Sequence, residues 1–219
     1  MFQYICHEFN HNGIRMKLRF VLPLVLLFSN CAQADYDMGM TCFNNRDYAC
    51  SYIEFKESAG SGDAKSQNML AVLYATGYGV KEDNKLAFEW HYRAAIQGYK
   101  YSQSAVGRYY ARGDGVEQDY KKAFEWYKKA AIQGYEQSQF DLGVMYQLGQ
   151  GVEQDLSKSL EWHQKAIDNG YYYSMDAISR AYESNQDLPK AIEWGIKSLE
   201  KGVGRDKKRI TKKENKKQR

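Results

Sequence analysis

A repeat of 36 residues constrains the fold of this chain more than any other feature. Tryptophans, single glycines and glycine pairs all recur at this interval. They are Trp90, Trp126 and Trp162, then Gly98, Gly134 and Gly170, and then Gly77/Gly79, Gly113/Gly115 and Gly149/Gly151. Self-similarity at a fixed period of about 20–50 residues is typical of proteins whose units bury their apolar faces only by stacking on neighbours. Such a stack offers an extended surface, which favours binding over catalysis.

The clearest copy, residues 100–135, predicts a pair of helices. Gly107 lies inside the first helix, where glycine costs about 1 kcal/mol against alanine, so we expect the second helix to approach closely there. Gly113 and Gly115 follow, and glycine can end a helix in the left-handed conformation. Asp119 then caps the second helix, which carries an apolar stripe of helical spacing. In the other copies the small residue recurs as Ala71, Gly143 and Ser179, and the aspartate as Asp47, Asp83, Asp155 and Asp187.

The units at both ends are degenerate, which is typical of terminal repeats. The last unit loses four residues from its inter-helix loop. The chain is therefore divided into a leader, a capping repeat, three full repeats, a shortened repeat and a basic tail. In that order, these are residues 1–34, 35–63, 64–99, 100–135, 136–171, 172–202 and 203–219.

The repeated residues resemble the Sel1-like repeat family, which is related to tetratricopeptide repeats. The similarity lies in the pattern A-x-x-L-G-x-x-Y…G-x-G-V…D-x-x-K-A-x-x-W-Y…A-x-x-G, which extends from Ala64 to Gly202. The resemblance implies an all-α fold, a right-handed α-solenoid of about five antiparallel helix pairs with a concave side. It also implies a non-enzymatic adaptor for protein partners, and it names no ligand.

The N-terminal segment predicts export. Basic residues at positions 15–19 precede an apolar stretch over residues 20–28, which is too short to span a bilayer, and an A-x-A cleavage motif ends at Ala34. We expect cleavage there and a periplasmic or secreted mature chain. The alternative is a lipoprotein anchored through Cys31. Met16 is a candidate start, in which case the residues before it are not translated.

Cleavage would leave two cysteines, Cys42 and Cys50. A pair of cysteines in an exported chain predicts one disulfide. The segment between them has the composition of an inter-helix turn, so the disulfide would join the two helices of the first unit. The alternative is a redox-active pair.

Charge is distributed unevenly along the chain. The formal net charge is +4, yet residues 205–219 alone carry nine Lys/Arg and two Asp/Glu, and residues 35–204 have a net charge of −5. We expect the tail to be a solvated end. The alternative is contact with an anionic membrane surface, to which each basic residue would contribute about 1 kcal/mol. Nucleic acid is not an expected partner of an exported chain.

Candidate metal and catalytic motifs have structural explanations. Residues 7–11 match H-E-x-x-H but precede the predicted cleavage site. The G-x-G-V loops follow helices, so helix-ending glycines explain them better than phosphate binding does. His91 and His163 occupy the slot of Tyr127 two repeats apart, which indicates aromatic packing. We therefore expect no catalytic residues, no metal site and no cofactor.

The candidate binding site is the groove lined by the first helix of each pair. Tetratricopeptide repeats use positions 2, 5 and 9 of that helix, counted so that the small residue is 8, and Arg112 lies one turn beyond the set. The carried-over residues are Lys65, Asn68, Val72, Tyr101, Ser104, Arg108, Arg112, Gln137, Phe140, Val144, Tyr173, Asp176 and Arg180. Aromatic and arginine side chains are enriched where binding energy concentrates. For Phe140, the alternative is packing against the neighbouring repeat.

Family resemblance offers three more specific functions. Some exported Sel1-like proteins are immunity proteins that neutralise lipid-degrading toxins directed at the periplasm. Some cysteine-rich relatives resemble weak β-lactam-binding or β-lactam-hydrolysing enzymes, but those carry a disulfide in nearly every repeat. Other exported relatives bind host immune proteins. A protein partner held in the groove, with the immunity role as one form of it, is the function we expect.

Overall fold

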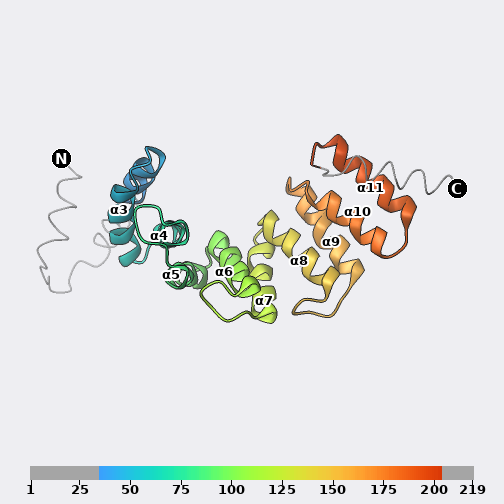
Figure 1. Ribbon diagram of the computed structural model, residues 1–219, viewed down its shortest axis with the longest axis horizontal. Coiled ribbons are helices and arrows are strands. Elements are labelled where there is room, and N and C mark those ends of the chain that lie inside the picture. Colours follow the sequence, from blue (N-terminus) through green and yellow to red (C-terminus); the bar gives the residue numbers. More distant parts are fainter. Residues whose placement is uncertain (1–34, 204–219) are drawn as a thin grey trace, which may run out of the picture. The chain divides into compact units, whose positions relative to one another are not determined.

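The computed structural model describes residues 35–203, and throughout that range the secondary structure consists of helices joined by short turns and loops (Figure 1). The predicted leader and nearly all of the basic tail lie outside the described residues. The chain divides into two compact units, Met1–Gln97 and Gly98–Arg219. Within each unit, consecutive helices pack against one another. The fold is an all-α repeat solenoid, as the repeat predicted.

The first unit has its core between α3 and α4. Phe55, Leu70 and Leu73 are fully buried there. Cys42 and Cys50 form the predicted disulfide, with their Cα atoms 5.8 Å apart, and it joins the first described helix to α3. The helices are residues 35–44, α3 (Tyr48–Gly60), α4 (Ala64–Thr76) and α5 (Asn84–Ile96).

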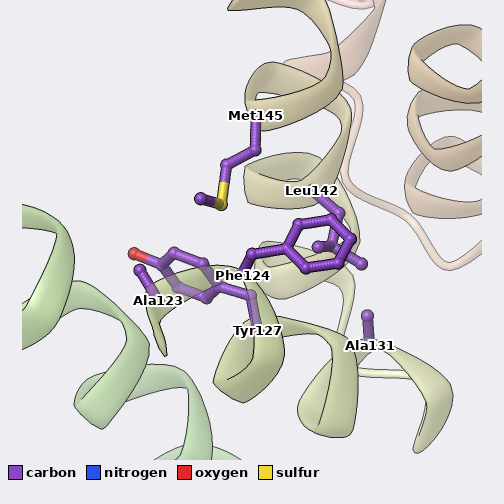
Figure 2. Close-up of a cluster of buried hydrophobic side chains, with 6 residues drawn as sticks. All are labelled: Ala123, Phe124, Tyr127, Ala131, Leu142 and Met145. Atoms are coloured by element: carbon purple, nitrogen blue, oxygen red, sulfur yellow. The ribbon is translucent and has the colours of Figure 1, made fainter. Parts of the chain in front are cut away.

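The second unit contains three helix pairs. Figure 2 shows part of its core, where Phe124 and Tyr127 of α7 meet Leu142 and Met145 of α8. Consecutive pairs therefore share one core, which is the property that makes repeats depend on their neighbours. The helices are α6 (Lys100–Arg112), α7 (Tyr120–Ile132), α8 (Glu136–Leu148), α9 (Leu156–Asp168), α10 (Ser174–Ser184) and α11 (Leu188–Glu200).

The predicted helix caps are confirmed. Each of the five repeated aspartates precedes a helix, and its carboxylate accepts a backbone hydrogen bond from the residue three positions later at 2.9–3.2 Å. These bonds satisfy amide groups that the first turn leaves free. At the opposite ends, Gly77, Gly113 and Gly149 close α4, α6 and α8 in the left-handed conformation, with φ of 71°, 79° and 69°.

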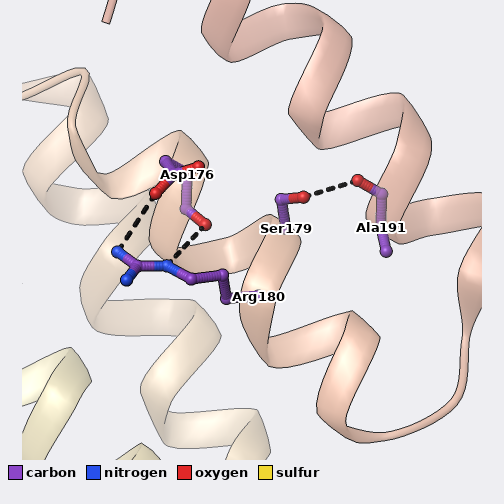
Figure 3. Close-up of polar contacts among 4 residues, drawn as sticks. All are labelled: Asp176, Ser179, Arg180 and Ala191. Carbon is purple, nitrogen blue, oxygen red and sulfur yellow. Dashed lines mark hydrogen bonds and ion pairs between the residues drawn. The ribbon is translucent and has the colours of Figure 1, made fainter. Parts of the chain in front are cut away.

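The small position inside each first helix is a site of close approach, as predicted. A Cβ atom placed on Gly107 would lie 2.8 Å from the Tyr127 ring. In the last pair the position holds Ser179, whose hydroxyl donates a hydrogen bond of 2.6 Å to the carbonyl of Ala191 on α11 (Figure 3). The side chain at this position is small because the second helix of the same pair lies directly against it.

In three pairs, a repeated amide contact links the end of the second helix, α5, α7 or α9, to the first helix of the pair. Gln97 donates to Gln67 at 2.8 Å, and Asn169 donates to Gln139 at 2.9 Å. Gln139 in turn donates to the carbonyl of Ala131 at 3.2 Å, so one buried amide connects α7, α8 and α9.

No helix within residues 35–203 combines the length and the apolar character needed to cross a membrane.

Candidate protein-binding site on the first helices

A cavity of about 440 Å³ lies in the second unit between residues of α6, α7 and α8. We call it the Arg108 cavity. It gathers five of the residues predicted for the groove, which are Tyr101, Ser104, Arg108, Arg112 and Gln137. The fold therefore brings together predicted groove residues from two successive repeats.

Two exposed arginines of α6 line this cavity. Arg108 and Arg112 are four residues apart, so they lie on the same helix face. Among the described residues, neither guanidinium has a hydrogen bond or an ion pair within 4.0 Å. Arg180 differs, because its guanidinium forms a 3.1 Å ion pair with Asp176 one turn earlier (Figure 3). The two α6 arginines thus keep their donors available to a ligand.

Asp141 of α8 also lines the Arg108 cavity, although it was not among the residues predicted for the groove. Burial raises the pKa of its carboxyl to about 7, even though a hydrogen bond from Gln137 and the charges of Arg108 and Arg112 lower it. Desolvation therefore outweighs the neighbouring cations. A carboxyl group with this pKa is partly protonated at neutral pH, so it compensates less than one of the two arginine charges.

Three tyrosines, together with Ala105 and Ala111, complete the wall of the Arg108 cavity. The ring of Tyr101 is 44% exposed and meets the ring of Tyr135 edge-on at a centroid distance of 5.2 Å. Burial, together with the charge of Asp141, raises the pKa of the Tyr127 hydroxyl. Burial likewise raises the pKa of Tyr135, with Glu136 as the next cause. Both phenols are consequently neutral at pH 7 and can donate hydrogen bonds.

A second cavity, of about 270 Å³, lies along α8 and α10 and is named here the Phe140 cavity. Phe140, Tyr173, Asp176 and Arg180 line it, and all four were predicted for the groove. Tyr173 is 51% exposed. Phe140 also packs against His163 of α9, with ring centroids 5.4 Å apart, so the packing expected as its alternative role coexists with a place in the cavity wall.

The other predicted residues lie outside these two cavities. Lys65, Asn68 and Val72 are on α4 in the first unit, where the Lys65 ammonium lies 5.5 Å from the centre of the Tyr36 ring. Val144 is half-buried on α8 and does not line either cavity. Ser104 differs from these four residues because it does line the Arg108 cavity, but its side chain is only 6% exposed. A binding role for these residues stays a prediction.

The two histidines lie in the helix interfaces. His91 is 3% exposed and His163 is fully buried. Burial lowers the pKa of His163 to about 4, with a smaller effect from the charge of Arg180, so its ring is neutral at pH 7. Within residues 35–203, no group of three or more His, Cys, Asp or Glu side chains is placed to hold a metal ion.

Helix pairs, capping aspartates and small residues at the crossing points define a repeat protein of the scaffold class. The chain belongs to the Sel1 repeat family, whose sequence profile matches residues 64–99, 100–135, 136–171 and 182–203, more than half of the chain. The Sel1 repeat fold is generally a protein-binding scaffold. No curated protein sequence matches this chain.

Three solved structures are similar to this chain to different degrees. A Sel1 repeat protein from Oxalobacter formigenes is 24% identical, with a TM-score of 0.71 over 77% of this chain and 69% of its own length. A protective antigen of uropathogenic Escherichia coli with an SLR fold is 28% identical, with a TM-score of 0.49 over 82% of this chain and 49% of its own. An immunity protein from Pseudomonas aeruginosa is 18% identical, with a TM-score of 0.39 over 68% and 70%. The first of these supports the solenoid fold.

Proposed function

We propose that this chain is an exported protein-interaction scaffold that holds a protein partner on the first helices of its second unit. The Arg108 cavity carries this proposal. It presents the exposed Tyr101 ring beside two arginines whose guanidinium groups form no hydrogen bond or ion pair within 4.0 Å among the described residues. Arginine and tyrosine are enriched at the centres of protein interfaces, where few residues supply most of the binding energy.

The Phe140 cavity extends this surface. Helix α8 contributes Gln137 and Asp141 to the Arg108 cavity and Phe140 to the second one. A partner segment lying across α8 would therefore touch both cavities, and it would meet the exposed Tyr173 ring on the far side. Two adjacent cavities favour a protein ligand over a single small molecule.

Export is supported by the predicted leader and by the disulfide. The leader lies outside the described residues. The disulfide between Cys42 and Cys50 is typical of an oxidising compartment. We place the mature chain, from residue 35 onwards, in the periplasm or outside the cell.

A more specific form of the proposal is an immunity protein that neutralises a periplasm-directed toxin. Its support is the family resemblance together with predicted export. A strain lacking this gene, grown beside a toxin-producing sibling, should die, and plasmid-borne wild-type protein should restore survival. Unharmed deletion cells would rule out the immunity role and leave the scaffold proposal standing.

Site-specific photocrosslinking in intact cells tests the scaffold itself. A photoreactive phenylalanine analogue at Tyr101 or Tyr173 should crosslink one protein, whose peptides mass spectrometry identifies. The matched control is Ile132, which is 70% exposed on α7 and lines neither cavity. A crosslink of equal yield to the same protein from Ile132, or none from both tyrosines, would contradict the proposed site.

A further inference from the structure

We propose that the Arg108 cavity recognises Asp or Glu side chains within a continuous acidic segment of the protein partner. This inference rests on the proposed function and deepens it, because it assigns the chemistry of the segment that the cavity binds. Three observations carry it, which are the unpaired arginines, the weak compensation of their charge and the length of the cavity wall.

The arginines supply the recognition. Arg108 and Arg112 lie one turn apart and face the cavity without an ion pair among the described residues. Neighbouring positions on one helix face have Cβ atoms about 5–6 Å apart, so each guanidinium can meet a carboxylate of its own or both can meet the same one. Guanidinium groups bind carboxylates through paired, charge-assisted hydrogen bonds, whereas a basic segment would be repelled.

The groups around Asp141 leave the cavity positive. Arg108 and Arg112 of α6 act on its carboxyl, Gln137 donates to it, and Tyr127 and Tyr135 are raised in pKa partly by its charge. The charge of Asp141 also contributes to raising the pKa of Tyr171, which lies ahead of α10. His163 of α9, which contacts α8 at Gly143, is neutral at pH 7 and adds no charge. Two cations therefore face at most one carboxylate, which is partly protonated near neutrality.

The shape of the wall favours a passing segment over a chain end. The lining residues of α6 run from Tyr101 to Arg112, which at 1.5 Å per residue is roughly 16 Å. A single terminal carboxylate occupies only a small part of that length. Tyr101, at the N-terminal end of this wall, offers an exposed ring to the aliphatic stems of an acidic segment.

Binding and pH are linked through Asp141. A carboxylate bound at the arginines neutralises their charge and adds a like charge, so the pKa of Asp141 rises above its value in the free protein. The complex then takes up a proton. Affinity for an acidic segment is consequently highest below pH 7 and falls as the pH rises through the pKa of free Asp141 and towards that of the complex.

Peptide titration of residues 35–219, followed through the arginine Nε–Hε signals in NMR spectra, tests the inference. The probes are acetyl-tetraglutamate amide, acetyl-tetraglutamine amide and acetyl-tetraglutamine with a free C-terminal carboxylate. We expect tetraglutamate amide to shift the Arg108 and Arg112 signals and to bind about tenfold more weakly to Arg108→Gln/Arg112→Gln. Lys121→Gln/Lys128→Gln, which removes the same charge from exposed sites on α7, should change binding less than about twofold.

Each other result overturns a defined part of the inference. Equal binding of the glutamine amide, or equal losses in both double variants, excludes carboxylate recognition at this cavity. Binding of only the free-acid glutamine peptide would show capture of a chain end instead of an acidic segment. The affinity of the wild type for tetraglutamate amide should fall about threefold or more between pH 6 and pH 8.5, whereas that of Asp141→Asn should not change with pH. If the affinity of Asp141→Asn falls as steeply as that of the wild type, Asp141 is not the group that links binding to pH. A positive Tyr101 crosslink with negative peptides would sustain the scaffold and reject this inference.

Discussion

At Gly107 the absence of a side chain lets α6 lie against the ring of Tyr127. Substitution Gly107→Ala would place a Cβ atom 2.8 Å from that ring, and Tyr127 is 6% exposed, so it has little room to move. Alanine should improve helix propensity by about 1 kcal/mol, but overpacking should cost more. We expect a net loss of about 1–3 kcal/mol in the free energy of unfolding, measured by urea denaturation.

Gly60 provides the matched control. It lies at the end of α3, and a Cβ atom there would have no neighbour within 4 Å. Gly60→Ala should therefore be neutral or raise stability by a few tenths of a kcal/mol up to about 1 kcal/mol. Equal effects of the two substitutions would show that the close approach at Gly107 is not what requires glycine.

His163 should make stability depend on pH. Its ring is fully buried, neither nitrogen has a hydrogen-bond partner among the described residues, and its pKa falls to about 4 on folding from an ordinary value of 6.5. Below pH 6.5 the unfolded chain binds a proton that the folded chain refuses, so stability falls as the pH drops from 6.5 to 4. The full loss is about 3 kcal/mol.

His163→Phe should abolish this particular slope. Thermal or urea unfolding between pH 4 and pH 7 would measure it as the difference between wild type and variant. A packing change introduced by phenylalanine shifts both ends of the variant curve alike, so it leaves the comparison of slopes intact. Parallel curves would mean that the imidazole is not excluded from protonation in the folded state.

Individual residues differ in how far the sequence reveals them. The capping role of Asp119 follows from a contact three residues away, so local pattern was enough. Asp141 occupies a slot that holds Met69, Ala105 and Ala177 in the other repeats, and this departure was the available signal. Its pKa depends on burial and on arginines of the preceding repeat, which no local pattern encodes.

At the scale of the helix, buried amides connect neighbouring elements. Gln139 is 4% exposed, donates to the Ala131 carbonyl and accepts from Asn169, so it bridges α7, α8 and α9. Gln139→Met keeps the length of the side chain but removes both bonds and leaves a buried carbonyl without that donor. We expect a loss of about 1–3 kcal/mol in the free energy of unfolding.

The exposed Gln154 is the control for this substitution. Its side chain also donates to a backbone carbonyl, that of Gln147 at 2.8 Å, but at the surface, where water can replace it. Gln154→Met should cost less than about 0.5 kcal/mol. A double-mutant cycle with Asn169→Ala should show coupling to Gln139 and none to Gln154, and additive effects at Gln139 would contradict the bridge.

The helices were more predictable from the sequence than the cavities, because the two depend on contacts over different distances along the chain. The start and end of each helix depend on contacts within a few residues, such as the left-handed φ of 79° at Gly113. The Arg108 cavity joins α6 to α8, whose residues are about one repeat apart in sequence. Counting groove positions found four of its residues on α6 and Gln137 on α8. It missed Tyr135, which lies in the turn before α8, because that counting considers only helix positions.

Across the whole chain, the repeats do not all rely on the same kind of stabilisation. The family profile matches from residue 64 onwards, so the described helices before that residue match the repeat less well. These helices carry the disulfide between Cys42 and Cys50. Closing so short a loop contributes about 2–3 kcal/mol in the chain-entropy account. A covalent link thus stabilises the part of the described chain that precedes the repeats matched by the family profile.

Positive and negative charge are separated along the chain, and this separation bears on whether the tail contacts a membrane surface. Residues 35–204 have a net charge of −5, and residues 205–219 add +7. If the tail contacts anionic lipid, the mature chain should co-sediment with vesicles containing phosphatidylglycerol, and deletion of residues 205–219 should abolish this binding. Each basic residue near such a surface contributes about 1 kcal/mol, so binding should also weaken steeply with added salt.

Vesicles of phosphatidylcholine alone are the control, because they offer the same bilayer without net charge. The Arg108→Gln/Arg112→Gln variant should co-sediment with anionic vesicles as the wild type does, since residues 205–219 have a net positive charge whereas residues 35–204 have a net negative one. Loss of binding in that variant would instead place the lipid contact at the cavity. Binding that survives tail deletion, or that is absent in every case, would leave the tail as a solvated end.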